Sequence, residues 1–195
     1  MEQPRRRGRT SDAERAERRN EILDVAVDSF RDVGFARTTI EGIATVAGVA
    51  KRTVYSYFGD KSAVFAAAVA RQHAYVDNAG EGQSDLLAAA VDIVIALHSD
   101  NSIALHRMMI GEAVQFPELA AAFYKSGPAK SIAFLEKILI DQHGQKAALC
   151  ADQLYTLLLG EEHRRRLLGL TSEPTAERAA QLAARAVGCV LRSDR

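Results

Sequence analysis

The stretch that decides the fold is residues 38–61, TTIEGIATVAGVAKRTVYSYFGDK. Thr38 and Thr39 favour the start of a helix, because their hydroxyl groups accept hydrogen bonds from the free N–H groups of a first turn. Gly48 ends this helix, since a left-handed turn residue costs little without a Cβ atom. A second short helix begins at Lys51, after a turn of only Gly48-Val49-Ala50. Two short helices joined by so tight a turn are typical of the helix-turn-helix motif.

The helix that begins at Lys51 surrounds two apolar residues with polar and aromatic ones. Val54 and Phe58 have an i, i+4 spacing, so both are expected on the buried face. The outward side chains are then Lys51, Arg52, Thr53, Tyr55, Ser56 and Tyr57. Such a helix fits the major groove of DNA, where these side chains reach base edges and phosphates. The alternative is a solvated helix hairpin whose tyrosines complete the core.

The rest of the chain predicts further helices and no strands. No segment alternates with a period of two and is rich in β-branched residues, so the expected fold class is all-α. The first helix is expected from Ser11 to Gly34, with the capping pair Ser11 and Glu14 and a buried face of Ile22, Leu23, Ala26 and Phe30. Later helices are expected over 63–76, from Ser84 or Asp85 to His98, and over 102–115, 117–125, 128–143, 145–169 and 175–192.

Composition narrows the class of protein without naming it. The 195 residues carry 25 Lys+Arg and 25 Asp+Glu, and this neutral balance does not by itself indicate nucleic-acid binding. The longest apolar run, Ala63 to Ala70, is far short of the roughly 20 residues that span a bilayer, and no export signal precedes it. A cytoplasmic protein is therefore expected. Cys150 and Cys189 form no CxxC pair, so buried reduced thiols are expected rather than a redox switch.

Residues 38–61, with Ile22, Leu23, Ala26, Phe30 and Gly34 before them, resemble the TetR family of transcriptional regulators. The resemblance covers about residues 15–66. It implies an all-α homodimer with an N-terminal three-helix helix-turn-helix head and a C-terminal helical body for ligand binding and dimerisation. We therefore expect an Arg-rich flexible arm over 1–14, the DNA-binding head over 15–60 and the body over 61–195. Arg5, Arg6, Arg7 and Arg9 make the arm a candidate for following DNA, or else a solvated tail.

The resemblance also implies roles for individual residues in the head. Thr39 would contact a backbone phosphate at the start of its helix. Lys51, Arg52 and Thr53 would face bases, and Tyr55, Tyr57 and Lys61 would hold phosphates. Ser56 lies where an aromatic residue or histidine is frequent in the family, so no contact is carried over to it.

A second stretch, about residues 103–135, resembles the AefR-like C-terminal domain of the same family. Its apolar helices predict a cavity, whose candidate ligand-binding residues are Leu97, His98, His106, Met109, Phe116, Phe123, Tyr124 and Tyr155. The alternative is that these side chains are plain core. His98 and His106 are eight residues apart, which is not a diagnostic metal-ligand spacing, so neither a metal nor a cofactor is predicted.

The final helix carries a stripe of small and apolar residues, Ala179, Leu182, Ala183, Ala186, Val187 and Val190. Paired with Leu154, Leu157 and Leu158, it predicts a four-helix dimer interface, the alternative being packing within one chain.

The expected function is a repressor that binds a palindromic operator as a homodimer and is released by a small apolar or amphipathic ligand. The alternative is a helical interaction protein without DNA binding. An enzyme is not expected, because the chain lacks GxSxG, P-loop, GxGxxG and HExxH motifs.

Overall fold

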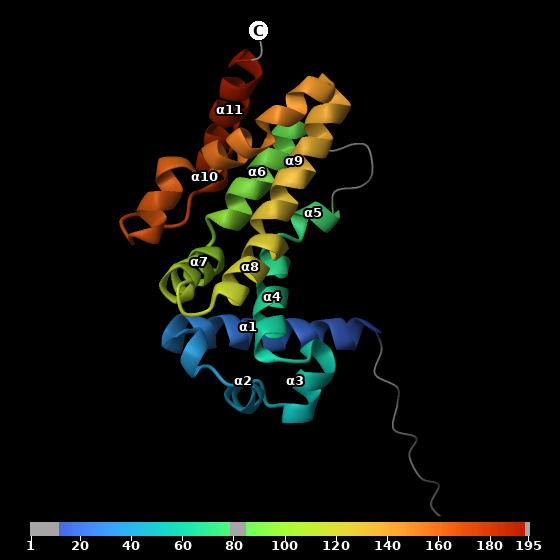
Figure 1. Cartoon of the computed structure of the whole chain (residues 1–195), viewed down its shortest axis with the longest axis vertical. Helices are drawn as coiled ribbons and strands as arrows, with labels where there is room; N and C mark the ends of the chain where they lie inside the picture. The colour runs from blue at the N-terminus through green and yellow to red at the C-terminus, as the bar shows by residue number, and fades with distance from the viewer. Residues whose placement is uncertain (1–11, 79–84, 194–195) are drawn as a thin grey trace, which may run out of the picture.

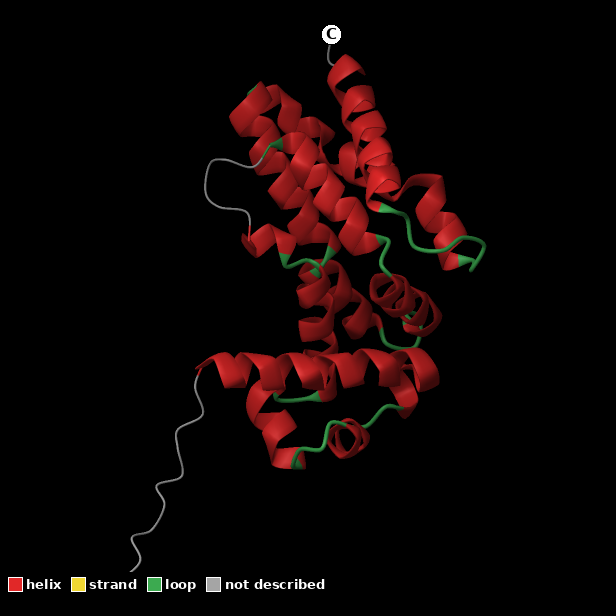
Figure 2. Cartoon of the chain, turned by 180° about the vertical axis from the view of Figure 1, so that it is seen from behind, coloured by secondary structure: helices red, strands yellow, loops and turns green. Residues whose placement is uncertain are grey.

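The computed structural model describes residues 12–78 and 85–193, and each regular element in those ranges is a helix (Figure 1, Figure 2). The expected Arg5–Arg9 arm and the proposed caps Ser11 and Ser84 lie outside the described residues. The elements in order are α1 (Asp12–Arg37), α2 (Ile40–Val46), α3 (Lys51–Phe58), α4 (Lys61–Gln72), α5 (Tyr75–Asn78), α6 (Leu86–Leu97), α7 (Asp100–Glu112), α8 (Pro117–Ser126), α9 (Pro128–His143), the 3-10 helix η1 (Gln145–Cys150), α10 (Ala151–Leu167) and α11 (Ala176–Ser193).

Local interactions determine where the helices of the helix-turn-helix begin and end. The regular part of α1 stops at Gly34, whose φ is 79°. Thr39 is the N-cap of α2, and its hydroxyl oxygen accepts a hydrogen bond from the Gly42 N–H at 3.0 Å. Gly48 has a φ of 64°, which is the left-handed turn predicted from the sequence. α3 then begins at Lys51, as expected.

Two of the expected helices are broken in the structure. The helix predicted over 63–76 begins at Lys61, where Asp60 caps it, and ends at Gln72. The backbone of His73 leaves the helical region, and the short α5 follows as a separate turn. The helix predicted over 145–169 is η1 followed by α10, which itself bends at Gly160 with a φ of 54°. No proline lies at these breaks, which is why the sequence did not reveal them.

The N-terminal core lies between the helix-turn-helix and the helices above it. In Figure 1, α4 lies above α1, and α2 and α3 lie below it. Buried side chains of this core include Ile22, Phe30, Val54 and Phe65. The same core contains residues of the predicted body, from α4, α7 and α8, so the two predicted domains share one apolar cluster.

The C-terminal core is a bundle of α6, α9, η1, α10 and α11. Ala179, Ala183, Ala186 and Val190 of α11 are buried in it, within one chain. These four members of the predicted dimer stripe are therefore packed internally, and the expectation that they face a second copy is wrong.

Cys189 is exposed and Cys150 is half-buried, so the expectation of two buried thiols is also wrong. Among the described helices none is by itself both long and apolar enough to cross a membrane, although α6 and α7 together meet the criteria across a 64° bend.

Candidate nucleic-acid interface and body cavity

The outer face of α3 is the candidate nucleic-acid interface. Val54 is buried and Phe58 half-buried, so α3 packs on the face that its spacing predicts. Lys51, Arg52 and Tyr55 are exposed, with Tyr55 at 47%. This leaves two cations and a phenol hydroxyl in solvent on a helix held by the core behind it, which is the chemistry that base edges and phosphates accept.

Two other predicted contact residues of α3 are only partly available. Thr53 is half-buried, and so is Tyr57, which packs against the N-terminal core with its ring 6.0 Å from that of Phe58. The side chain of Lys51 lies 3.5 Å from Glu41 of α2 in an ion pair between exposed groups. Such a pair contributes little to stability, so Lys51 can exchange the carboxylate for a phosphate at small cost.

Thr39 is exposed at the start of α2. Its hydroxyl oxygen already accepts the capping hydrogen bond from Gly42. That bond uses an oxygen lone pair, so the hydroxyl hydrogen is left to donate to a phosphate. The predicted contact is compatible with the cap.

Lys61 is arranged differently from the expectation. Its Nζ donates to the carbonyl oxygens of Phe35 at 2.6 Å, Thr38 at 2.8 Å and Ala36 at 3.3 Å. An ammonium group has three hydrogens, so each has a protein acceptor here. The predicted phosphate contact therefore requires Lys61 to give up a carbonyl. Burial also lowers the pKa of Lys61, while Glu112 opposes this shift.

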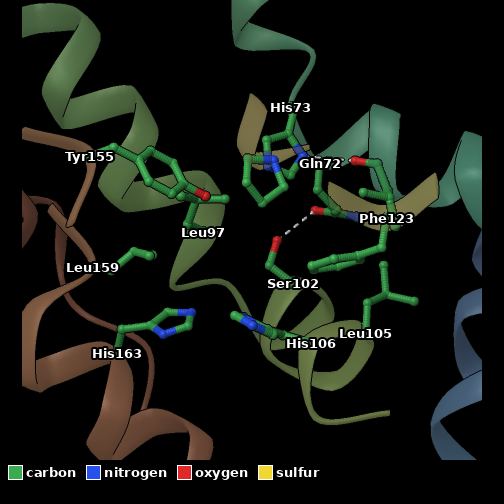
Figure 3. Close-up of a pocket in the computed structure, with 12 residues that line it drawn as sticks. Gln72, His73, Leu97, Ser102, Leu105, His106, Phe123, Tyr155, Leu159 and His163 are labelled. Carbon is green, nitrogen blue, oxygen red and sulfur yellow. Dashed lines mark hydrogen bonds between the residues drawn. The ribbon is translucent and has the colours of Figure 1, made fainter. Parts of the chain in front are cut away.

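A mostly apolar cavity lies in the body between α4, α6, α7, α8, α9 and α10 (Figure 3). Its volume is about 30 Å³. The lining residues are Val69, Gln72, His73, Leu97, Ser102, Leu105, His106, Phe123, Pro128, Tyr155, Leu159 and His163. Four of the predicted ligand-binding residues meet here, namely Leu97, His106, Phe123 and Tyr155.

The other four predicted ligand-binding residues lie elsewhere. His98 is fully buried outside the lining, with its Nε2 3.1 Å from the Leu158 carbonyl oxygen. Met109 belongs to the N-terminal core, and Phe116 packs against Phe35 with the ring centroids 5.4 Å apart. Tyr124 is 57% exposed. These four residues therefore pack elsewhere in the body or lie at its surface, and they do not line this cavity.

Three histidines form a chain of ring contacts beside the cavity. The His163 ring lies 5.1 Å from that of His106 and 5.3 Å from that of His98, centroid to centroid. Burial, and then the proximity of His106 and His98, lowers the pKa of His163 to about 3. Burial also lowers the pKa of His106 and of His98. At neutral pH the cluster is therefore uncharged.

Four polar residues that line the cavity were not predicted from the sequence: Gln72, His73, Ser102 and His163. His73 follows an apolar run whose helix was expected to continue past it, and His163 sits in the charged segment Glu161–Arg166. Neither position carries a periodic signal, because each is brought to the cavity by the packing of separate helices. Ser102, on α7, lies close to the expected start of its helix, where a cap is the ordinary interpretation.

Helix α7 connects the cavity to the helix-turn-helix. Ser102, Leu105 and His106 line the cavity, and Leu105 also belongs to the N-terminal core. At the other end of α7, the Glu112 Oε1 atom accepts a hydrogen bond from the Ala36 N–H at 3.4 Å. Helix α7 thus contacts the cavity at one end and α1 of the helix-turn-helix head at the other.

Two family models match the chain. Residues 22–68 match the model described as "Bacterial regulatory proteins, tetR family", and residues 84–193 match "AefR-like transcriptional repressor, C-terminal domain". A Mycobacterium tuberculosis protein named as the mycofactocin biosynthesis transcriptional regulator MftR is 30% identical over 106 residues. That match covers 51% of this chain and 53% of MftR, so it spans about half the length of the relative.

Solved structures of similar fold cover nearly the whole chain. A TetR-family transcriptional regulator structure from Mesorhizobium loti has a TM-score of 0.71 at 23% identity, over 92% of this chain and 97% of that one. The flavonoid-responsive regulator FrrA has a TM-score of 0.64 at 26% identity, over 91% and 97%. Members of the matched family are transcriptional regulators rather than enzymes. Because the C-terminal model alone covers more than half of the chain, this protein belongs to the TetR family of DNA-binding transcriptional regulators.

Proposed function

We propose that the chain is a repressor that binds a palindromic operator as a homodimer and is released when a small apolar or amphipathic ligand enters the body. The observation that carries the DNA-binding half is the outer face of α3, where Lys51, Arg52 and Tyr55 are exposed on a helix anchored by buried Val54. Each copy inserts α3 into one major groove. Two copies then read half-sites about 34–36 Å apart, or a multiple of that distance.

The proposed dimer interface uses the outer sides of α10 and α11, because the inner side of α11 is occupied by the chain's own core. A groove of about 350 Å³ runs between these helices, lined among others by Leu157, Leu182 and Cys189. Leu157 is 46% exposed, and the groove also carries two acidic and two basic side chains, so a helix of a second copy would meet both apolar and charged groups there.

The proposed release mechanism runs through α7. A ligand that enlarges the cavity pushes on Leu105 and His106 and so shifts α7. The shift is passed to α1, because Glu112 of α7 accepts a hydrogen bond from the Ala36 N–H of α1. The two copies of α3 then no longer match the spacing of the grooves. Ligand and DNA must oppose each other reciprocally, with a typical coupling of about 1–3 kcal/mol.

The relative FrrA supports a small-molecule response, since its name describes it as flavonoid-responsive. It is 26% identical to this chain across nearly its full length, so we propose a ligand of comparable apolar character here. The division into an arm over 1–14, a head over 15–60 and a body over 61–195, and a cytoplasmic location, are part of the same proposal.

The test is fluorescence anisotropy of the full chain on labelled duplexes that tile the DNA around its own coding region. The wild type is expected to bind one duplex far more tightly than the rest. A variant with Lys51, Arg52 and Tyr55 all changed to alanine is expected to lose that preference, while the control Lys137→Ala on α9 keeps it. Absence of DNA binding by the wild type at low salt would favour the alternative, a helical interaction protein.

A further inference from the structure

His73 holds an unused hydrogen-bond acceptor beside the cavity. Its side chain is 5% exposed, and its Nδ1 lies 2.9 Å from the carbonyl oxygen of Val69. A carbonyl oxygen only accepts, so Nδ1 carries the ring hydrogen and Nε2 presents a lone pair. Within the described part of the chain this buried Nε2 has no hydrogen-bond partner. Buried polar atoms are nearly always paired, so an orphan at a cavity wall indicates a place for a ligand atom.

The surroundings of His73 hold its ring in place at the cavity wall. The ring borders the cavity at the end of α4 (Figure 3) and lies against the backbone of Gly127. A Cβ atom at position 127 would lie 2.6 Å from the ring Cε1 and 2.9 Å from Nε2. Only glycine permits so close an approach, so the ring is held against the backbone of Gly127.

The charge of the cavity restricts what can fill it. None of the lining residues that the structure describes is an Asp, Glu, Lys or Arg. Burial lowers the pKa of His73 and raises that of Tyr155, so both are neutral at pH 7. The nearby charges that act on the lining histidines, Lys130 on His73 and Arg166 on His163, are both positive and disfavour a cationic guest. An anion would have to be buried without a counter-ion in direct contact.

We infer that the cavity takes a neutral amphipathic molecule with an apolar body and a hydroxyl or N–H group, whose hydrogen is accepted by His73 Nε2. This inference rests on the proposed role of the cavity as the ligand site. The cavity volume of about 30 Å³ is close to the volume that one water molecule occupies in the liquid. Such a ligand therefore enters by displacing lining side chains. Leu97, Leu105 and Leu159 contact its apolar part.

The test compares three probes of the same ring system, measured by calorimetry on the full chain without DNA. 2-Naphthol has a donor, 2-methoxynaphthalene has only an acceptor, and 2-naphthoate is an anion. 2-Naphthol is expected to bind about 10- to 100-fold more tightly than 2-methoxynaphthalene, because a missing donor leaves the buried acceptor unpaired. 2-Naphthoate is expected to bind most weakly. Equal affinities for the first two probes, or no binding of 2-naphthol, would overturn the inference.

Variants assign the preference to His73. His73→Leu removes the acceptor and is expected to make 2-naphthol and 2-methoxynaphthalene equal. His73→Gln restores an acceptor oxygen near the same place and is expected to recover the preference. The control His143→Leu, at an exposed position near the end of α9, is expected to behave as the wild type. Urea unfolding checks that each variant is folded, and a preference that survives in folded His73→Leu would overturn the inference.

Release from DNA is measured separately, which keeps the two proposals distinguishable. If 2-naphthol binds with the His73-dependent preference but does not release DNA, the repression mechanism fails and the cavity assignment stands. If the donor preference is absent while other compounds release DNA, the repression mechanism stands and the assignment to His73 fails.

Discussion

The Lys61 ammonium lies 2.6 Å from the carbonyl oxygen of Phe35 and 4.3 Å from the centroid of the ring of the same residue. Lys61 begins α4, and Phe35 belongs to the last turn of α1, after the break at Gly34. One side chain thus stabilises the corner where the chain passes from α1 to α2. That corner determines where Thr39 and the rest of the helix-turn-helix lie.

Lys61→Met is expected to destabilise the fold by about 1–3 kcal/mol, because hydrogen bonds from a charged donor to carbonyls that are part-buried are lost. The measurement is the urea unfolding midpoint of the full chain. Lys137→Met, at an exposed position of α9, is the matched control and is expected to shift the midpoint little. Equal midpoints for Lys61→Met and the wild type would show that the corner does not depend on this lysine.

Arg52→Ala is expected to weaken binding to the preferred duplex and to relax the base preference at one position of each half-site. Arg52 is exposed on the outer face of α3, and a good bidentate contact to a base contributes about 1–3 kcal/mol of discrimination. The measurement is affinity for a panel of duplexes with single base changes. Uniform weakening across the panel would reassign Arg52 to a phosphate.

Acid is expected to destabilise the fold through its buried histidines. Burial lowers the pKa of His73, His98 and His106, and with its neighbours lowers that of His163 to about 3. A histidine in the unfolded chain titrates near 6.5, so below that pH the unfolded state binds more protons than the folded state. Stability is therefore complete above about pH 6.5 and falls with decreasing pH, by up to about 1.4 kcal/mol per pH unit for each histidine.

Urea midpoints between pH 7.5 and pH 5 measure this acid sensitivity. His163→Gln is expected to reduce the slope of stability against pH, because it removes one of the groups that must stay neutral. His143→Gln, at an exposed position, is expected to leave the slope unchanged. A midpoint that is constant over this pH range in the wild type would contradict the neutral cluster.

Gly127→Ala is expected to destabilise the fold by about 1–3 kcal/mol, the usual cost of overpacking. Its φ of −122° suits alanine, so the effect comes from contact, with the added Cβ at 2.6 Å from His73 and 3.1 Å from Val69. Gly111→Ala, in α7 with no atom within 4 Å of the added Cβ, is the control and is expected to stabilise by about 0.5–1 kcal/mol. Thermal unfolding of both variants checks the opposite signs.

Much of the fold was predictable because its signals are local. Thr39 and Asp85 cap the helices that follow them, and Gly48 adopts the turn conformation that the helix-turn-helix requires. Each depends only on residues within one turn of itself. The family was identified for the same reason, since the residues from Thr38 to Lys61 follow one another in fixed order.

The cavity was predicted only in part, because its polar residues come from helices that are distant in sequence. His73 directly follows α4, Ser102 lies in the first turn of α7 and His163 lies in α10, and only packing brings them together. The α11 stripe shows a related effect. Periodicity correctly predicts that Ala183 lies on an apolar face, but it does not tell whether that face meets the same chain or a second copy.

The central claim is that the outer face of α3 reads DNA, and selection of bound sequences from a pool of random duplexes tests it most directly. The wild type is predicted to enrich an inverted repeat whose half-sites are one helical turn, or a multiple of one turn, apart. The variant with alanine at positions 51, 52 and 55 is predicted to enrich nothing. Enrichment of the same repeat by that variant, or none by the wild type, would contradict the claim.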